Sequence, residues 1–211
     1  MEFDPFWLLM VGVRTTLVLS AISIALSLIV GTVIGVMRVA PLTPVRSFAE
    51  GYIEFFRNIP LLIILFFILD GLPKAGITLS FFNTAVVGLT VYTAAYVAEV
   101  VRAGLQALSR GQIEAARSLG LTWGQTMRLV LLPQALRTTI PPLGTLSIAL
   151  IKNTSLASTI AVSEILYQAE FIEGRTFNPN IFLIAGLLYL LLTVPASGLV
   201  NVVERKLAIA R

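Results

Sequence analysis

Long stretches without a charged residue constrain the fold of this chain more than any other feature. Residues 15–37 and 76–98 are each 23 residues without Asp, Glu, Lys or Arg, and residues 176–203 form a third stretch of 28. A helix needs about 20 apolar residues to cross the roughly 30 Å hydrocarbon core of a bilayer. Each of the three stretches is therefore long enough to span a membrane as a helix.

The composition excludes several classes of soluble protein. Hydrophobic residues make up 57% of the chain and charged residues 12%, whereas soluble domains carry about 25% charge. So little polar surface excludes an ordinary cytosolic enzyme, a disordered chain and a nucleic-acid-binding protein, despite the net charge of +4. The chain has no cysteine and no histidine. We therefore expect no disulfide, no thiolate chemistry and no metal site.

Two further spans are less regular. Residues 52–70 contain two charged residues near their start, Glu54 and Arg57. These are three apart and could pair on one face of a helix. The next apolar run meets Lys152 and then continues uncharged to Glu164, although a lysine inside a span is costly. The sequence thus predicts an all-α integral membrane protein with a single domain, residues 1–211, and five transmembrane helices at about residues 12–37, 52–70, 76–101, 138–164 and 178–203.

The basic residues predict the orientation of these spans. If the N-terminus is outside, the inner segments hold eleven of the 15 Lys and Arg residues and the outer segments hold three. Because Lys and Arg concentrate on the cytoplasmic side of membrane proteins, we expect the N-terminus outside and the C-terminus inside. Residues 102–137 then form a long cytoplasmic loop.

This loop carries helix signals of its own. Residues 109–112, Ser-Arg-Gly-Gln, have the pattern of a capping box, and the helix that they open would end at Gly120 in a left-handed conformation. Residues 122–125, Thr-Trp-Gly-Gln, form a second capping box. The helix after it would be interrupted or bent by Pro133. We expect two short helices on the inner face of the membrane.

The first of these short helices has two interpretations. Ala115 and Ala116 are small enough to let the groove of another protein approach the backbone, and Glu114 and Arg117 can add polar contacts at the rim. Alternatively, the helix is amphipathic and touches only lipid headgroups.

Polar residues near the fourth span are candidates for the substrate path. Lys152 could attract a substrate carboxylate, with Asn153, Thr154 and Ser155 providing an amide and hydroxyls. It could instead pair with an acidic residue of this chain or of a second copy. Glu164, twelve residues later, could hold a substrate ammonium group or reach interfacial water.

The third span offers further candidates. Glu99 and Arg102 are three apart at its inner end and are suited either to a local ion pair or to a substrate role. Tyr92 and Tyr96 share one helix face. They could line the pathway, or face another helix through a hydrogen bond.

Two prolines follow the predicted start of the fourth span. Prolines within a membrane helix free backbone carbonyls, as in the broken helices that line substrate sites. For Pro142 we expect instead the first turn of a helix, where proline is favoured. Pro141 fits either arrangement.

The spacing of several motifs resembles a known family of transporter subunits. Glu114-Ala115-Ala116, then Gly120, then Leu132-Pro133, resembles the EAA loop of ABC importer membrane subunits. The flanking residues 98–104 and the Lys152-Asn153-Thr154-Ser155 run extend this resemblance to the polar amino acid permeases of the histidine/glutamine/glutamate branch. The resemblance covers nearly the whole chain.

The resemblance implies a fold, a function and a set of partners. It implies a type I ABC importer permease in the bacterial cytoplasmic (inner) membrane that imports polar amino acids similar to glutamate or glutamine. The partners would be two ABC ATPase subunits, a second permease copy or paralogue and an extracytoplasmic substrate-binding protein. The residues that would couple to the ATPase are Glu114, Ala115, Ala116, Arg117, Gly120, Leu132 and Pro133.

This chain would not hydrolyse ATP by itself. It has no G-x-x-x-x-G-K-[ST] sequence to cradle phosphates, so the resemblance implies that ATP and Mg²⁺ bind to the partner ATPase and that this chain needs no cofactor. One alternative is the same architecture carrying basic amino acids. A second is an ATP-independent carrier, although such carriers typically contain two related halves and we find no internal repeat.

Overall fold

Every regular element in residues 4–207, the part of the chain that this computed structural model describes, is a helix. Three of these helices are long and apolar enough to cross a membrane: α1 (Pro5–Met37), α4 (Phe81–Gln106) and α9 (Asn180–Leu207). Two bent pairs of helices bring the number of candidate spans to as many as five. The expectation of an all-helical membrane protein is confirmed.

The first bent pair begins with α2 (Thr43–Asn58), after which the chain turns by 106°. The expected span 52–70 runs across this turn instead of forming one straight helix. Pro60 explains the turn, because the residue before a proline is disfavoured in the helical region and Ile59 is extended, with φ −103° and ψ 132°. Three short helical segments follow: α3 (Leu61–Phe66), η1 (Phe67–Gly71) and η2 (Leu72–Ala75).

The second bent pair contains a long rod built from four consecutive helical segments. The rod comprises α6 (Trp123–Thr126), the π-helical η3 (Met127–Leu131), α7 (Leu132–Asn153) and the 3₁₀-helical η4 (Thr154–Ile160). A bend of 47° separates the rod from α8 (Ile165–Thr176).

Prolines lie inside this rod without ending it. Pro141 and Pro142 are interior residues of α7, so the expected first-turn position of Pro142 is wrong. The helix starts earlier, at the second capping box. It runs through η3 and then continues past Pro133 into α7. Since proline lacks an N–H group and its ring crowds the preceding turn, the wider π-helical turn just before Pro133 lets the helix continue.

The most extensive helix packing joins α1 to α4. Gly31 and Gly35 of α1 face α4 so closely that a Cβ atom on Gly31 would lie 2.5 Å from Cβ of Val97. A Cβ atom on Gly35 would lie 2.7 Å from the carbonyl oxygen of Ala98. The two glycines form a G-x-x-x-G pattern, which permits close approach of membrane helices and was a usable signal in the sequence.

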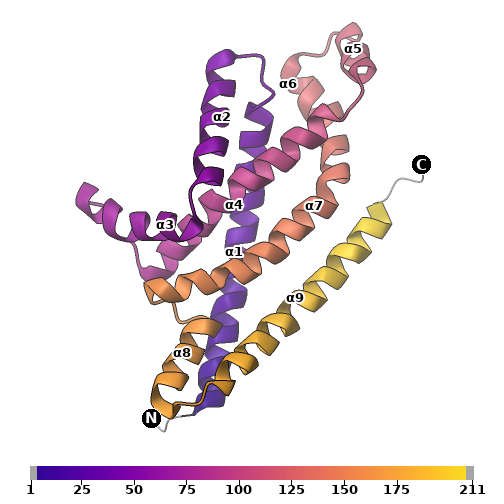
Figure 1. Cartoon of the computed structure of the whole chain (residues 1–211). Coiled ribbons are helices and arrows are strands. Elements are labelled where there is room, and N and C mark those ends of the chain that lie inside the picture. Colours follow the sequence, from indigo (N-terminus) through magenta and orange to yellow (C-terminus); the bar gives the residue numbers. More distant parts are fainter. Residues whose placement is uncertain (1–3, 208–211) are drawn as a thin grey trace.

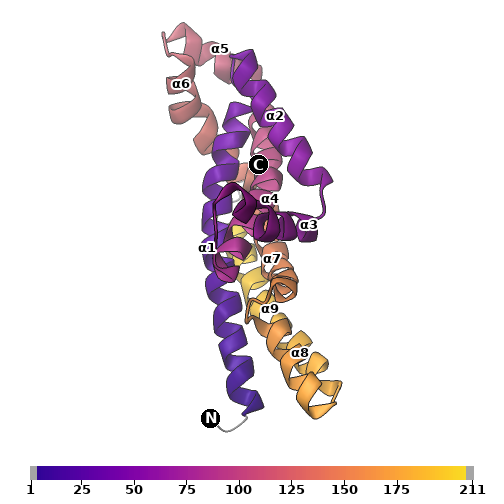
Figure 2. The same ribbon diagram turned by 90° about the vertical axis from the view of Figure 1, so that its left-hand side faces the viewer.

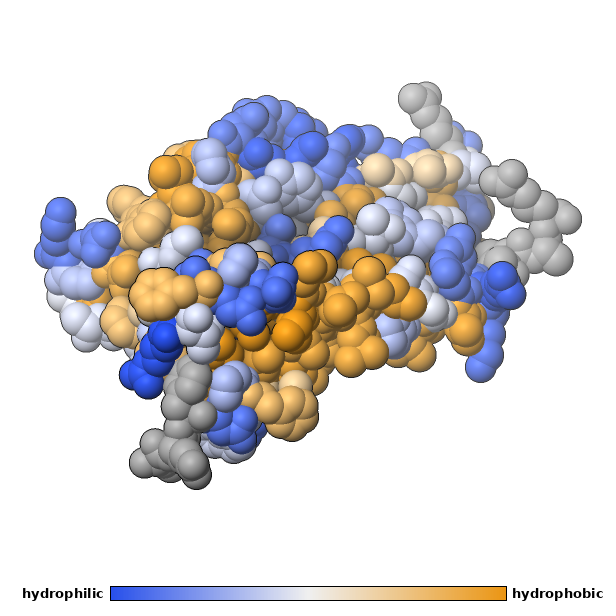
Figure 3. Space-filling model, turned by 60° about the horizontal axis from the view of Figure 1, so that its bottom comes forward, coloured by the Kyte–Doolittle hydropathy of each residue, from blue (hydrophilic) through white to orange (hydrophobic). Residues whose placement is uncertain are grey.

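The molecule is elongated, with its N-terminus and its long inner loop at opposite ends (Figures 1 and 2). Near the loop end lie α5 (Arg110–Ser118) and α6. Most of α9 is exposed, and its outward side chains are apolar, including Leu183, Leu187 and Leu191. Figure 3 shows a broad hydrophobic surface bordered by hydrophilic side chains, as a protein surrounded by lipid requires.

Candidate coupling loop and polar path

The coupling loop begins with α5, which a side-chain hydrogen bond and the packing of Ile113 hold to the long rod. The helix starts after Ser109 as expected, but the Ser109 hydroxyl makes no capping hydrogen bond, so the first capping box is wrong. Gln112 points elsewhere: its Nε2 donates to Oε1 of Gln134 at 2.7 Å. Gln134 lies on α7, so this contact fixes α5 against the start of the fourth span.

The turn after α5 has the expected geometry. Gly120 has φ +76°, a left-handed conformation that favours glycine. Its N–H donates to the Arg117 carbonyl at 2.9 Å, and the Leu121 N–H donates to the Ala116 carbonyl at 3.2 Å. These two hydrogen bonds form a Schellman motif, so the end of α5 is closed by its own backbone.

The second capping box is confirmed. The Thr122 hydroxyl accepts from the Gln125 N–H at 3.3 Å, and Gln125 Oε1 accepts from the Thr122 N–H at 2.9 Å. Between them, the Schellman motif and the capping box bond the backbone on both sides of the Gly120 turn. The turn therefore fixes the direction of α5 relative to α6.

The coupling residues divide into an outward face and an inward face. Glu114, Ala115 and Arg117 are exposed, whereas Ala116 is buried, with 4% of its surface accessible. Leu119 was not among the expected coupling residues, yet it is 81% exposed at the tip of the loop. Its position directly before a helix-ending glycine was the signal in the sequence that could have identified it.

Leu132 and Pro133 do not join this exposed tip. Leu132 is half-buried beside the core residues of α4 and η3. Pro133 is exposed in the first turn of α7. Both residues belong to the junction that carries the loop into the fourth span.

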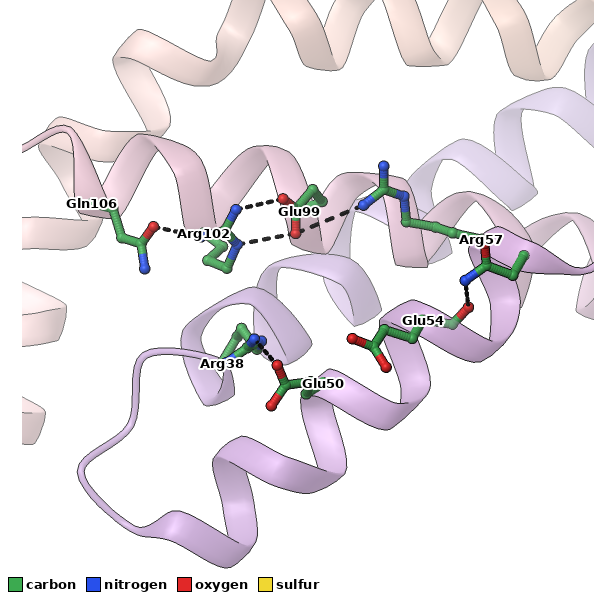
Figure 4. A network of polar contacts seen from close by, with 8 residues as sticks. Arg38, Glu50, Glu54, Arg57, Glu99, Arg102 and Gln106 are labelled. Atoms are coloured by element: carbon green, nitrogen blue, oxygen red, sulfur yellow. Dashed lines mark hydrogen bonds and ion pairs between the residues drawn. The ribbon is translucent and has the colours of Figure 1, made fainter.

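A network of charged side chains connects α2 to α4 (Figure 4). Glu99 accepts two hydrogen bonds from Arg102, at 2.5 and 3.0 Å, so the local ion pair is present. The same carboxylate lies 4.0 Å from the guanidinium of Arg57 on α2. The expected pair between Glu54 and Arg57 is wrong: Arg57 faces Glu99, and Glu54 has no ion pair among residues 4–207.

The two tyrosines of α4 extend this network. Their hydroxyl groups are 3.1 Å apart and their ring centroids 5.0 Å apart, so Tyr92 and Tyr96 bond to each other. The guanidinium of Arg57 lies 5.4 Å from the centre of the Tyr96 ring, within the range of a cation–π contact. The structure thus brings together three expected path residues, Tyr92, Tyr96 and Glu99, and adds Arg57 to them.

The depth of this network restricts what its exposed face can touch. Arg57 lies 14 residues after Thr43 along α2, which corresponds to about 21 Å at 1.5 Å per residue. The Arg57 side chain is 42% exposed and that of Glu99 is 30% exposed. Charged groups inside a membrane do not face lipid tails. If residues 52–70 enter the membrane as the sequence predicts, this face of α2 and α4 is expected to meet water or another protein chain.

Lys152 and its neighbours lie apart from this network, at the end of α7. Lys152 is exposed and forms no ion pair within the described part of the chain. The hydroxyl groups of Thr154 and Ser155 donate to the carbonyls of Ile151 and Lys152, at 2.7 and 2.8 Å. Their protons are therefore bonded within the helix, while Asn153 is the last residue of α7.

Glu164 has a different role from either expectation. Its side chain is 0% exposed, which leaves no surface for interfacial water or a substrate ammonium group. The carboxylate caps α8 by accepting from the Tyr167 N–H at 2.7 Å, and it also accepts from the hydroxyl of Tyr189 on α9. The neighbouring Ile165 N–H donates to the Thr16 hydroxyl of α1 at 3.3 Å. Glu164 therefore joins α8 to α9, and its neighbour Ile165 adds the link to α1.

Comparison with protein families identifies one that covers most of the chain. Residues 24–209 match the model of the family described as "Binding-protein-dependent transport system inner membrane component". The probable glutamine ABC transporter permease protein GlnM of Bacillus subtilis is 42% identical over 206 residues, which are 97% of this chain and 95% of that protein. The glutamate/aspartate import permease protein GltK of Escherichia coli is 35% identical, over 93% of this chain and 92% of that protein.

Solved structures share the arrangement of the helices. A crystal structure of an amino acid ABC transporter with histidines superposes with a TM-score of 0.85 at 33% identity, covering 98% of this chain and all of that one. An inward-facing structure of the MetNI methionine ABC transporter superposes with a TM-score of 0.84 at 24% identity, covering 99% of this chain and all of that one. The second comparison shows a common fold only.

Proposed function

The chain belongs to the binding-protein-dependent transport system inner membrane components, and on that premise we propose how its helices move a polar amino acid. It is a multi-pass permease subunit of an ABC importer, and ATP hydrolysis takes place on a separate subunit. The ATP-independent carrier considered from the sequence is thereby excluded. The similarity to GlnM and GltK supports glutamine or glutamate as the substrate.

The assembly that we propose contains two of these permease chains or one chain with a paralogue. Two ATPase subunits, which bind ATP and Mg²⁺, dock at the coupling loops, and an extracytoplasmic binding protein delivers the amino acid at the opposite end. The exposed charges of α2 and α4 support this assembly, because a single chain leaves them on a surface that lipid cannot cover.

The observation that carries the docking proposal is the exposed tip of α5 at the end of a continuous rod. Glu114, Ala115 and Leu119 present a small apolar surface with one charge. The Gln112–Gln134 hydrogen bond and the closed Gly120 turn join that surface to the fourth span. A movement of the docked ATPase is thereby passed to the membrane, provided that the ATP-bound state favours one orientation of the helices.

The polar network of α2 and α4 is the best-supported part of the substrate path. A free amino acid carries a carboxylate and an ammonium group, and Arg57 and Glu54 present the opposite charges without a close ion pair to each other. Arg57 is only loosely held by Glu99, at 4.0 Å, and so remains available to a carboxylate. We assign the network a role in guiding the substrate, and Lys152 a secondary one.

Docking is tested by enlarging the exposed face of α5. We expect Ala115→Trp to abolish both co-purification of the cognate ATPase and ATP-driven uptake of glutamine into proteoliposomes, because the indole would separate the two surfaces. Gly174→Trp is the matched control for co-purification, since Gly174 lies on α8 at the other end of the molecule with open space around it. Co-purification of the ATPase with the Ala115→Trp permease would refute the docking assignment.

The substrate path is tested by removing the charge of Arg57. A hydrogen bond to a charged group contributes roughly 1.5–3 kcal/mol, so we expect Arg57→Gln to raise the KM for uptake about 10- to 100-fold while the ATPase still co-purifies. Arg205→Gln, at the inner end of α9, is the matched control and should leave KM unchanged. Competition by glutamine, glutamate and arginine in the same assay identifies the class of substrate. An unchanged KM in Arg57→Gln would remove this residue from the path.

A further inference from the structure

An apolar groove lies between the inner end of α1 and the start of the rod. Its volume is about 520 Å³, and almost all of its lining is apolar. On one side the groove is bounded by α1 and the first turn of α2. On the other side it is bounded by α6, η3 and the start of α7. The lining residues that matter here are Val33, Val36, Leu42, Val45, Met127 and Leu132.

A second cavity of about 500 Å³ lies beside this groove and is basic. Arg38, Arg46 and Arg117 line it, together with Gln106 and several apolar side chains. Both cavities are lined by Trp123 and Met127, so they are separated only by this part of α6 and η3. A hydrophobic groove and a basic cavity therefore adjoin each other at the loop end of the molecule.

Most of the arginines around these cavities have no acidic partner. Arg38 is bonded to Glu50. Arg46 and Arg117 at the basic cavity, and Arg128 at the apolar groove, form no ion pair within residues 4–207. All three are exposed. One unpaired guanidinium group at the apolar groove and two at the adjoining cavity are complementary to a ligand with a hydrocarbon tail and an anionic head.

We propose that this site binds one anionic phospholipid from the inner leaflet. The acyl chain lies in the groove between α1 and η3, and the phosphate lies among Arg46, Arg117 and Arg128. Basic pockets between membrane helices on the cytoplasmic side are suited to anionic headgroups, and guanidinium groups bind phosphate through paired hydrogen bonds. Trp123, partly exposed where the two cavities adjoin, suits the boundary between headgroup and hydrocarbon.

The position of the lipid gives it a structural consequence. The groove separates α1 from the segment that connects the coupling loop to α7. A bound acyl chain would fill that space and hold α6 and η3 against α1. The lipid composition of the inner leaflet would then affect how firmly the loop is supported, independently of the contacts that α5 makes with the ATPase.

The proposal is tested on the assembled transporter, permease with its ATPase, by native mass spectrometry. Dioleoylphosphatidylglycerol and dioleoylphosphatidylcholine are offered in turn at equal concentration. We expect selective retention of phosphatidylglycerol, and about 25-fold weaker retention in the double variant Arg46→Gln/Arg128→Gln, since each arginine near an anionic surface contributes roughly fivefold, or ~1 kcal/mol. Arg14→Gln, an exposed arginine of α1 outside both cavities, should retain the lipid fully.

A second pair of variants tests the groove without changing charge. Gly124 lines the groove and has open space around its Cβ position, so Gly124→Phe fills the groove and should also abolish selective retention. Gly186→Phe on α9, likewise in open space, is its control. If Gly124→Phe retains the lipid, the acyl chain does not occupy this groove, and if inorganic phosphate displaces the lipid, the site binds a free anion. Either result overturns the proposal. Equal retention of both lipids by the wild-type complex would also overturn it, as would retention by the permease alone but not by the complex.

Discussion

Glu164 shows at the scale of one residue how a charged group in this protein can be structural. The sequence indicated an ionisable residue near a membrane surface, and two functional roles followed from that position. It could not indicate burial, because the helices that enclose Glu164 come from α1, α8 and α9, far apart in the chain. The residue nevertheless has an N-cap function that depends only on local spacing to Tyr167.

Replacing this carboxylate should destabilise the outer end of the molecule. Glu164→Ala removes the cap of α8 and leaves the hydroxyl of the half-buried Tyr189 without this acceptor, so we expect a loss of about 2–4 kcal/mol in the free energy of unfolding. Glu164→Gln keeps one acceptor oxygen and should lose less. Thermal unfolding in detergent measures both.

Glu170→Ala is the control, because Glu170 is an exposed carboxylate on the same helix. This variant should unfold at the wild-type temperature. Equal unfolding temperatures for all three variants would disprove the role of Glu164.

Charged pairs within one helix were easier to predict than pairs between helices. Glu99 and Arg102 are three apart on α4 and pair as their spacing suggests. Glu54 and Arg57 have the same spacing on α2, yet Arg57 turns to Glu99. Spacing gives the possible local partner, while the helix that packs alongside decides which partner is bound. Arg57 therefore became a candidate path residue only when the structure placed α2 beside α4.

At the scale of helices, glycine on α1 sets the separation of the central pair. Gly35→Ala would place a methyl group 2.7 Å from the Ala98 carbonyl oxygen, and a backbone atom cannot rotate away. We expect a loss of about 1–3 kcal/mol in the free energy of unfolding, measured as a lower thermal unfolding temperature.

Gly51→Ala is the matched control on α2. The Cβ position of Gly51 faces open space, and alanine favours a helix by roughly 1 kcal/mol over glycine. The control should therefore unfold at the wild-type temperature or slightly above it. If Gly35→Ala behaves like Gly51→Ala, the close packing of α1 on α4 does not limit the stability of the protein.

Local signals predicted helix ends well and the course of whole spans less well. The Gly120 turn and the Thr122 capping box depend on neighbours within a few residues, and both have the expected geometry. The bend at Pro60 and the passage of α7 through Pro141 and Pro142 differ from the straight span and the helix start that the sequence suggested. A proline can begin, bend or continue a helix, and the choice depends on the packing around it.

At the scale of the whole molecule, the remaining prediction concerns its direction in the membrane. The loop end carries α5 and α6, and the turn between α8 and α9 lies at the end with the N-terminus (Figure 1). The excess of basic residues predicts that the loop end is cytoplasmic. This orientation can be predicted from the distribution of Lys and Arg alone, because it does not depend on how the helices pack.

The absence of cysteine from the sequence makes this orientation simple to test. The two single-cysteine variants are Ser118→Cys and Asn178→Cys. Both positions are exposed, and they lie at opposite ends of the molecule. In intact spheroplasts, a membrane-impermeant maleimide should label the cysteine at position 178 but not the one at position 118. Permeabilised spheroplasts provide the control, in which both are labelled. The opposite pattern in intact spheroplasts would invert the proposed topology.

The unbroken helical course from Trp123 to Asn153 gives the protein a lever. Thirty-one residues at 1.5 Å each correspond to an arm of about 46 Å, and the Pro141–Pro142 pair lies a little beyond its middle. A tilt of about 10° around the midpoint would displace each end by about 4 Å, in opposite directions. Pushing the cytoplasmic end one way would thus swing the far end, with Lys152, the other way, and the chain would need no further moving part to reverse the direction of motion across the membrane.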